Sequence, residues 1–175
     1  MKIALSIAHE PNSVGAKRGV FTEYGMSCHV TGILAERLQR RGHEVYIIGS
    51  GTLSWKTNRI NDLNCDVGVE IHFNSSIHPT TKGAMCLHAG SKQGEKLAEI
   101  IGRRISEVLG VGDLKPKLGK YQLDPKNKLL YILRKTNCPF VVVEPCYLSN
   151  DDDLTSVNMS LIAFAVCDGL ELYAS

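Results

Sequence analysis

The 175-residue sequence lacks a long apolar run, a paired-cysteine motif and a strong excess of charge. No apolar stretch reaches the roughly 20 residues that a membrane-spanning helix needs, so we expect no integral membrane segment. The six cysteines contain no Cys-x-x-Cys pair, which argues against a structural zinc knuckle. The formal net charge of +2 gives no independent case for a nucleic-acid partner, although a mildly basic face could still assist binding to an anionic polymer.

The beginning of the sequence also lacks the features of a secretion signal. Residues 1–12 carry one lysine and a short apolar run, without a long apolar segment or a small-residue cleavage site. We therefore expect residues 2–8 to form the first strand. Without an export signal, the cysteines are expected to be free thiols, several of them buried.

The length and the alternating patterns favour a single α/β domain that covers residues 1–175. Short apolar runs predict strands, and apolar residues at helical spacing predict helices. Predicted strands cover residues 2–8, 44–48, 67–73, 83–89, 129–133 and 140–144, and predicted helices cover residues 23 to about 41, 54–64, 91–109 and 158–172. Because the central runs are apolar on both faces, we predict a twisted, mostly parallel sheet of about five to six strands with helices on both faces.

Polar residues stand where three of these strands end. His9 follows the first strand, His72 and Glu144 close two later strands, and Glu23 opens the first helix. In open α/β sheets, sites gather at the carboxyl ends of the strands. Two imidazoles and a carboxylate with one open position form the usual ligand set of a catalytic zinc, and a further carboxylate near the attacking water can act as general base.

From residue types alone, His9, Glu23 and His72 can hold Zn²⁺, and Glu144 can be the base. The spacing is scattered, however, and there is no local His-Glu-x-x-His helix. The alternative therefore stays open that these are polar side chains satisfied at strand ends or exposed on the surface.

Three sequence blocks resemble, in order, those of the zinc-dependent N-acetylmuramoyl-L-alanine amidases, in the branch that includes many phage endolysins. The first strand ends in His9, and Gly15-Ala16 and then Glu23 follow it. "VEIHFNSS" (residues 69–76) is similar to the family's Ser-Ile-His-Ala-Asn block, and "CPFVVVEPCYLSNDDD" (residues 138–153) is similar to its closing Pro-x-x-x-x-Glu-x-x-Phe-Leu-Ser-Asn block. Arg59 and the "KGAMCLHA" segment also stand where the family has an arginine and a Gly-led strand.

The resemblance implies a peptidoglycan hydrolase that uses a zinc-activated water. It would cut the amide between N-acetylmuramic acid and the L-alanine of the stem peptide, with His9, Glu23 and His72 as zinc ligands and Glu144 as the catalytic base. The implied partner is bacterial peptidoglycan, and the implied location is the cytoplasm until release onto the cell wall. Two alternatives stay open: another zinc amidohydrolase or peptidase that cuts within the stem peptide, and a non-catalytic wall-binding module on a degenerate amidase fold.

The sequence also departs from the family pattern. The usual Gly-His-Gly-Gly is Ala8-His9-Glu10-Pro11 here, which makes Glu10 a rival to Glu23 as a ligand or a residue that supports the ligands. Cys146 stands two residues after Glu144, as a buried filler, a competing ligand or a thiol open to oxidation. We expect no further wall-binding domain within these residues, and the oligomeric state is not predicted.

Three further features have two interpretations each. Glu70 lies two residues before His72 and so on the same face of the strand, either as a partner of that histidine or as a paired core charge. Asn74 either fixes a ligand or loop, or forms a plain Asx turn. The lysine-rich loop of residues 110–128 is either a solvated segment or a contact for an anionic glycan.

Overall fold

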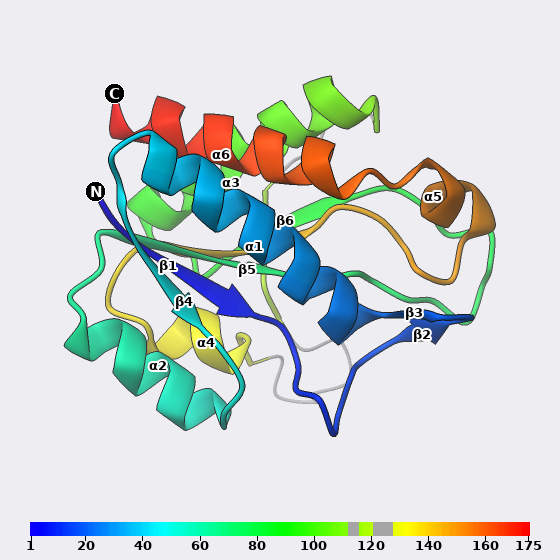
Figure 1. The fold of residues 1–175 in the computed structure, drawn as a ribbon, viewed down its shortest axis with the longest axis horizontal. Helices are drawn as coiled ribbons and strands as arrows, with labels where there is room; N and C mark the ends of the chain where they lie inside the picture. Colours follow the sequence, from blue (N-terminus) through cyan, green and yellow to red (C-terminus); the bar gives the residue numbers. More distant parts are fainter. Residues whose placement is uncertain (112–115, 121–127) are drawn as a thin grey trace.

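The computed structural model of the chain describes residues 1–111, 116–120 and 128–175, in which strands and helices alternate (Figure 1). The strands of the main sheet are β1 (Lys2–Ile7), β4 (Glu44–Ile48), β5 (Val67–Ile71), β6 (Met85–His88), β7 (Lys117–Leu118) and β8 (Phe140–Glu144). Their order across the sheet is β4-β1-β5-β8-β6-β7, and every neighbouring pair is parallel except β6 and β8. The mostly parallel sheet, predicted with about five to six strands, is confirmed and has six.

Helices cover both faces of this sheet, as predicted (Figure 1). The helices α1 (Glu23–Arg40), α3 (Lys92–Leu109) and α6 (Met159–Ala174) pack on one face, and α2 (Leu53–Asp62) and α4 (Tyr131–Lys135) pack on the other. Each face has its own apolar core: Val69 belongs to the first and Val142 to the second. All five residues of β5 are therefore buried, which explains its nearly continuous apolar sequence.

Two local predictions differ from the structure. The predicted strand at residues 129–133 is wrong, because α4 forms one helical turn there, with the amide of Arg134 bonded to the carbonyl of Leu130. This turn directs Ile132 and Leu133 into the second core, and a short apolar run cannot distinguish that arrangement from a strand. The short helix α5 (Asp151–Ser156) was not predicted, and its N-cap Asn150 accepts a hydrogen bond from the amide of Asp153.

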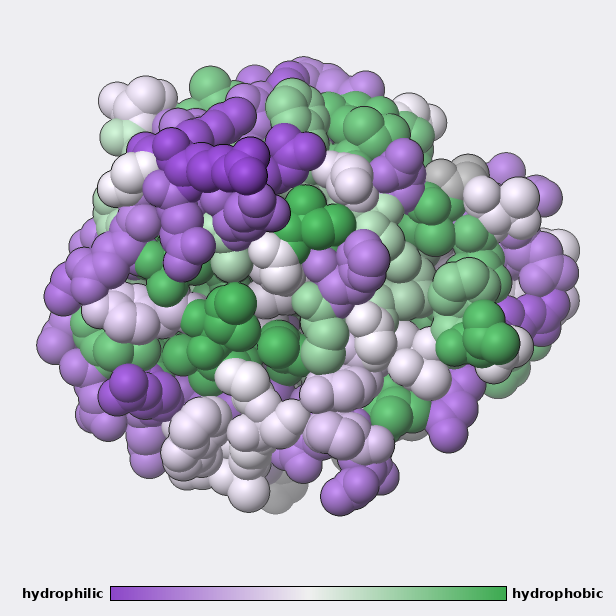
Figure 2. Space-filling model, in the orientation of Figure 1, coloured by the Kyte–Doolittle hydropathy of each residue, from purple (hydrophilic) through white to green (hydrophobic). Residues whose placement is uncertain are grey.

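The long loop predicted for residues 110–128 contains β7, which pairs with β6. Its residues 112–115 and 121–127 lie outside the described residues. A second small sheet, the hairpin of β2 (Lys17–Arg18) and β3 (Phe21–Thr22), projects at the right edge of Figure 1. Figure 2 shows apolar side chains at this edge, and Val20 and Phe21 are among the exposed large apolar residues. Among the described residues, no helix is both long and apolar enough to cross a bilayer.

The parallel pairing of β1, β5 and β8 places three chain segments at one edge of the sheet. Ile7 pairs with Ile71, and Ile71 pairs with Val143, so the residues after each strand emerge side by side. The amide of His72 donates to the carbonyl of Val143, which extends the contact beyond the strands. His9, His72 and Glu144 are brought to the same edge by this register, as expected for parallel strands.

Candidate metal centre

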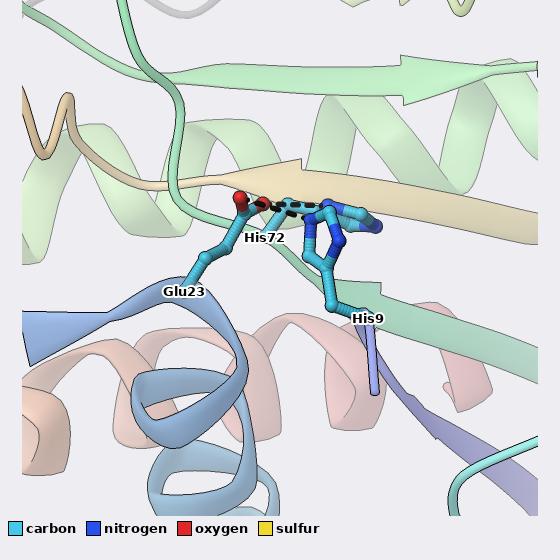
Figure 3. Close-up of side chains that lie close together, drawn as sticks. All are labelled: His9, Glu23 and His72. Atoms are coloured by element: carbon cyan, nitrogen blue, oxygen red, sulfur yellow. Dashed lines mark hydrogen bonds and ion pairs between the residues drawn. The ribbon is translucent and has the colours of Figure 1, made fainter. Parts of the chain in front are cut away.

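His9, Glu23 and His72 converge at this edge, as Figure 3 shows. His9 Nε2 lies 2.9 Å from Glu23 Oε2, and His72 Nδ1 lies 2.8 Å from Glu23 Oε1. One ligand atom from each residue lies within 4.8 Å of the other two. The imidazole rings meet edge to face, with centroids 5.1 Å apart. The two histidines and the glutamate predicted from the sequence as ligands therefore form one compact group.

Glu23 is held by the N-terminus of α1. Thr22 caps the helix by accepting a hydrogen bond from the amide of Gly25, and Glu23 is the first helical residue, as predicted. Its buried carboxylate accepts hydrogen bonds from the amides of Ala16 and Phe73 as well as from the two histidines. Burial alone would raise the pKa of Glu23, but the hydrogen bonds from His72 and His9 outweigh it and hold the pKa far below its usual range.

His9 leaves β1 with an unusual backbone. Its φ of 63° lies in the left-handed region, which non-glycine residues seldom adopt. The loop then folds back over the group, and Gly15 (φ 71°) packs so closely that a Cβ atom there would lie 2.6 Å from His9 Nε2. Gly15 is therefore required for space as well as for backbone conformation.

His72 stands between two carboxylates. Its Nε2 donates to Glu70 Oε1 at 2.7 Å, opposite the Nδ1 contact with Glu23. Burial would lower the pKa of His72, but the hydrogen bonds to Glu23 and Glu70 raise it to about 10. Without a metal, the imidazolium supplies the positive charge that these carboxylates require, and a bound cation would take over that role.

Glu70 itself is buried, and Ser6 donates a hydrogen bond to its second oxygen. Burial raises the pKa of Glu70, but the hydrogen bond and charge of His72, with smaller contributions from Ser6 and Lys56, lower it below its usual range. Glu70 is therefore hydrogen-bonded to His72, and the charge of the buried Lys56 also helps to lower the pKa of Glu70. The structure thus contains elements of both interpretations that the sequence left open.

Glu144 closes β8 beside this group. Its Oε2 is buried and has no hydrogen-bond partner among the described residues. Burial raises the pKa of Glu144 to about 7, and the charge of His72 lowers it less than burial raises it. A carboxyl group that changes charge near neutral pH, with one oxygen free, is suited to accept and return a proton.

The donor set fits a zinc ion. Two imidazoles and a carboxylate are common ligands of catalytic zinc, and in a tetrahedral site with bonds of about 2.0–2.1 Å the ligand atoms lie roughly 3.3 Å apart. The contacts of 2.9 Å and 2.8 Å to Glu23 are slightly shorter, so small movements of these side chains would make room for the ion. Hydrogen bonds to Glu70 and to backbone amides would support ligands of such an ion.

A cavity of about 480 Å³ opens beside the two histidines, on the face of the sheet that α2 and α4 cover. Its wall is mainly apolar, and its polar lining includes Lys56 and Glu70. The residues that line it are His9, Glu10, Ser13, Gly51, Leu53, Lys56, Glu70, His72, Leu130, Tyr131, Ile132 and Val142. The group is therefore accessible from a hollow that an extended substrate could enter.

The structure places the remaining predicted residues apart from the metal ligands. Among the described residues, the group of close donors does not include Glu10, which forms a backbone bridge with Ser13 and lines the cavity. Asn74 Oδ1 accepts a hydrogen bond from the amide of Ser75, one residue on, whereas an Asx turn would use the amide two residues on. Arg59 is exposed on α2. Cys146 lies in the first core, where burial raises the pKa of its thiol to about 12, in keeping with a filler.

Lys56 was missed by the sequence analysis. It is 2% exposed, and its ammonium donates to the carbonyls of Ile7 and His9. One signal was present: Lys56 stands four residues before Ile60, so it shares the inward face of α2. This spacing indicates that Lys56 is buried but does not identify its partners.

Comparisons with known proteins find a family, a relative and solved structures to which this chain is similar. A model of the family described as N-acetylmuramoyl-L-alanine amidase matches residues 3–171. An uncharacterised protein of Clostridium perfringens strain 13, CPE1502, is 28% identical over an alignment of 160 residues, and the match covers 88% of this chain and 46% of that protein. The chain thus spans about half the length of this curated relative.

Two solved structures share the fold over nearly the whole chain. The catalytic domain of CwlV, an N-acetylmuramoyl-L-alanine amidase from Bacillus (Paenibacillus) polymyxa, has a TM-score of 0.87 at 19% identity, covering 99% of this chain and 97% of that one. The catalytic domain of the CD27L endolysin targeting Clostridia difficile has a TM-score of 0.81 at 24% identity, covering 98% of this chain and 97% of that one. At these identities the likeness establishes a common fold.

Proposed function

The chain belongs to the N-acetylmuramoyl-L-alanine amidase family, and from this premise we propose that it hydrolyses the amide between N-acetylmuramic acid and the L-alanine of the peptidoglycan stem peptide. The observation that carries the proposal is the compact group of His9, Glu23 and His72 beside a carboxylate, Glu144, with a free buried oxygen. A chain of this family that keeps both the ligand set and the base has what amide hydrolysis requires.

In this proposal His9, Glu23 and His72 hold Zn²⁺ within the catalytic domain of residues 1–175. The nitrogens that face Glu23, Nε2 of His9 and Nδ1 of His72, are the ones placed to bind it. When bound, zinc would lower the pKa of a water molecule and polarise the carbonyl of the scissile amide. Glu23 neutralises part of the ion's charge and is itself kept ionised by its hydrogen bonds.

Glu144 is the proposed general base. Its free oxygen accepts the proton of the attacking water, and the carboxylic acid so formed passes that proton to the departing L-alanine amine. Burial raises the pKa of Glu144 in the metal-free protein, and a bound cation would lower it again and so favour the carboxylate form that accepts the proton. The mainly apolar cavity beside His72 gives room for the substrate on one side of the ligands.

The proposed partner is bacterial peptidoglycan, and the proposed place of action is the cell wall. The expected period in the cytoplasm before release and the absence of a nucleic-acid partner stay predictions. Glu10 and Asn74 stay candidates for substrate contact. Among the described residues, Glu10 does not belong to the compact group of His, Cys, Asp and Glu donors.

The proposal is tested by measuring zinc content and wall clearing on the same preparations. Zinc-loaded protein should carry one ion per chain and clear a suspension of sacculi, whereas Glu144→Ala should carry the ion without clearing. Glu99→Ala, which changes an exposed carboxylate on α3, is the matched control and should behave as wild type. Protein that binds sacculi but never clears them with added zinc would contradict the proposal in favour of a wall-binding module.

A further inference from the structure

A buried cation and a buried anion lie behind the two histidines and have no part in the proposed proton transfers. Lys56 is 2% exposed and Glu70 is 3% exposed, and both line the cavity beside the centre. Charged side chains are costly to bury unless they are paired and hydrogen-bonded, so their position calls for a role. Each makes a direct contact with a different proposed ligand.

Glu70 holds the ring of His72. Its Oε1 accepts the Nε2 hydrogen at 2.7 Å, while Ser6 donates to its Oε2 from the neighbouring strand β1. With Nε2 engaged, the ring has one nitrogen left, and Nδ1 faces Glu23 at 2.8 Å. The carboxylate therefore fixes both the orientation of the imidazole and the nitrogen that faces the centre.

Lys56 holds the backbone of His9. Its ammonium donates to the carbonyl of Ile7 at the end of β1 and, at 3.4 Å, to the carbonyl of His9. His9 has the left-handed φ of 63°, a conformation that persists only where its surroundings enforce it. A buried donor from α2 across these two carbonyls supplies such enforcement.

We propose that Glu70 and Lys56 are positioning residues that set the two imidazoles for the metal before it binds, Glu70 through the ring of His72 and Lys56 through the backbone of His9. The inference rests on the proposed metal centre and adds the residues that preorganise it. A hydrogen-bonded partner behind a metal-binding histidine typically contributes about 10–100-fold to metal affinity. The competing interpretation is that the two buried charged side chains stabilise the fold and leave metal affinity unchanged.

The test is the affinity for Zn²⁺, measured by competition with a chromophoric chelator at fixed pH. Glu70→Leu should weaken binding about 10–100-fold. Glu70→Gln keeps an acceptor oxygen for the Nε2 hydrogen, so it should bind zinc more tightly than Glu70→Leu and more weakly than wild type. Lys56→Met should also weaken binding, because His9 is released to other backbone conformations.

Two matched controls separate positioning from general stability. Glu171→Gln alters a second Glu–His hydrogen bond, to His43, far from the centre along the chain, and should leave zinc affinity unchanged. Lys92→Met removes an exposed lysine at the start of α3 and should do the same. Nitrogen-15 spectra of zinc-loaded protein give a second readout: the Nε2–H proton of His72 should exchange slowly with water in wild type and Glu70→Gln, where it is hydrogen-bonded, and rapidly in Glu70→Leu.

The outcomes distinguish this inference from the proposed function. Wild-type protein that binds zinc together with Glu70→Leu and Lys56→Met variants of equal affinity would overturn the positioning role and leave the metal centre standing. Wild-type protein that binds no zinc would overturn both. The graded order of wild type, Glu70→Gln and Glu70→Leu, with both controls unchanged, supports the role.

Discussion

Replacing Glu144 with glutamine should stabilise the metal-free protein at alkaline pH while it removes the activity. One oxygen of this carboxylate is buried without a partner among the described residues, and burial raises the pKa from 4.5 to about 7. An ionised Glu144 therefore destabilises the folded state, by up to about 3 kcal/mol, because each pKa unit corresponds to about 1.36 kcal/mol. Glutamine has nearly the same shape and carries no charge, so the variant avoids this cost.

The effect has a defined pH window. Because the folded-state pKa lies above the unfolded value, the stability that protonated Glu144 provides is fully present below pH 4.5 and is lost as the pH rises through 7. Wild type and Glu144→Gln should therefore unfold alike near pH 4. At pH 8 the variant should be more stable by up to about 3 kcal/mol, roughly 6–12 °C in Tm for a chain of this size.

Thermal unfolding followed by circular dichroism, with a chelator present, measures this difference. The chelator is needed because a nearby cation would favour the ionised carboxylate and shrink the effect. Glu99→Gln changes an exposed carboxylate and should show no difference at either pH. A Glu144→Gln protein that is no more stable than wild type at pH 8 would refute the claim that burial of the ionised Glu144 carboxylate destabilises the folded state.

Three further predictions follow from the same geometry. A chelator should abolish wall clearing and lower the Tm of the wild type, and added Zn²⁺ should restore both. Activity that persists in the presence of the chelator would contradict the metal mechanism. Gly15→Ala should lose zinc binding, because the added Cβ atom would lie too close to the His9 ring. Gly19→Ala is the control, since Gly19 lies in the same loop with a similar φ but has open space for a Cβ atom, so this variant should lose only stability. Equal zinc affinities of the two variants would contradict this packing. Thr22→Ala removes the cap beside Glu23, so it should cost about 1 kcal/mol of stability and weaken zinc binding. The equivalent cap change Ser91→Ala on α3 should cost similar stability and leave zinc binding unchanged, as calorimetry and a zinc titration can check.

Much of the fold could be predicted because local signals agreed with one another. The strands at residues 44–48 and 140–144 have the predicted bounds, since each is a short β-prone run with a turn residue nearby. The helix predicted from residue 23 begins at Glu23, after the cap Thr22, and the helix predicted for residues 91–109 covers Lys92–Leu109, after the cap Ser91. The carboxyl ends of parallel strands lie at the same edge of a sheet, which is why His9, His72 and Glu144 could be predicted to lie close together from the sequence alone.

The failures have a different cause. The five residues at 129–133 fit a strand or one helical turn equally well, and packing of Ile132 and Leu133 against the second core decides between them. The role of Lys56 could not be predicted, because its hydrogen-bond partners are the backbone carbonyls of Ile7 and His9, about 50 residues away in the sequence. The role of Glu70 was ambiguous for the same reason. The alternation of side chains along a strand places it on the same face as His72, but only the tertiary structure shows that Ser6 and Lys56 also lie near it.

The most direct test of the proposed function is mass spectrometry of the products from sacculi digested with the zinc-loaded protein. We expect stem peptides with a new L-alanine amino terminus and glycan strands whose lactyl groups carry a newly formed carboxylate, with neither product formed by Glu144→Ala. A new amine at any other position in the stem peptide would contradict it and identify a peptidase instead.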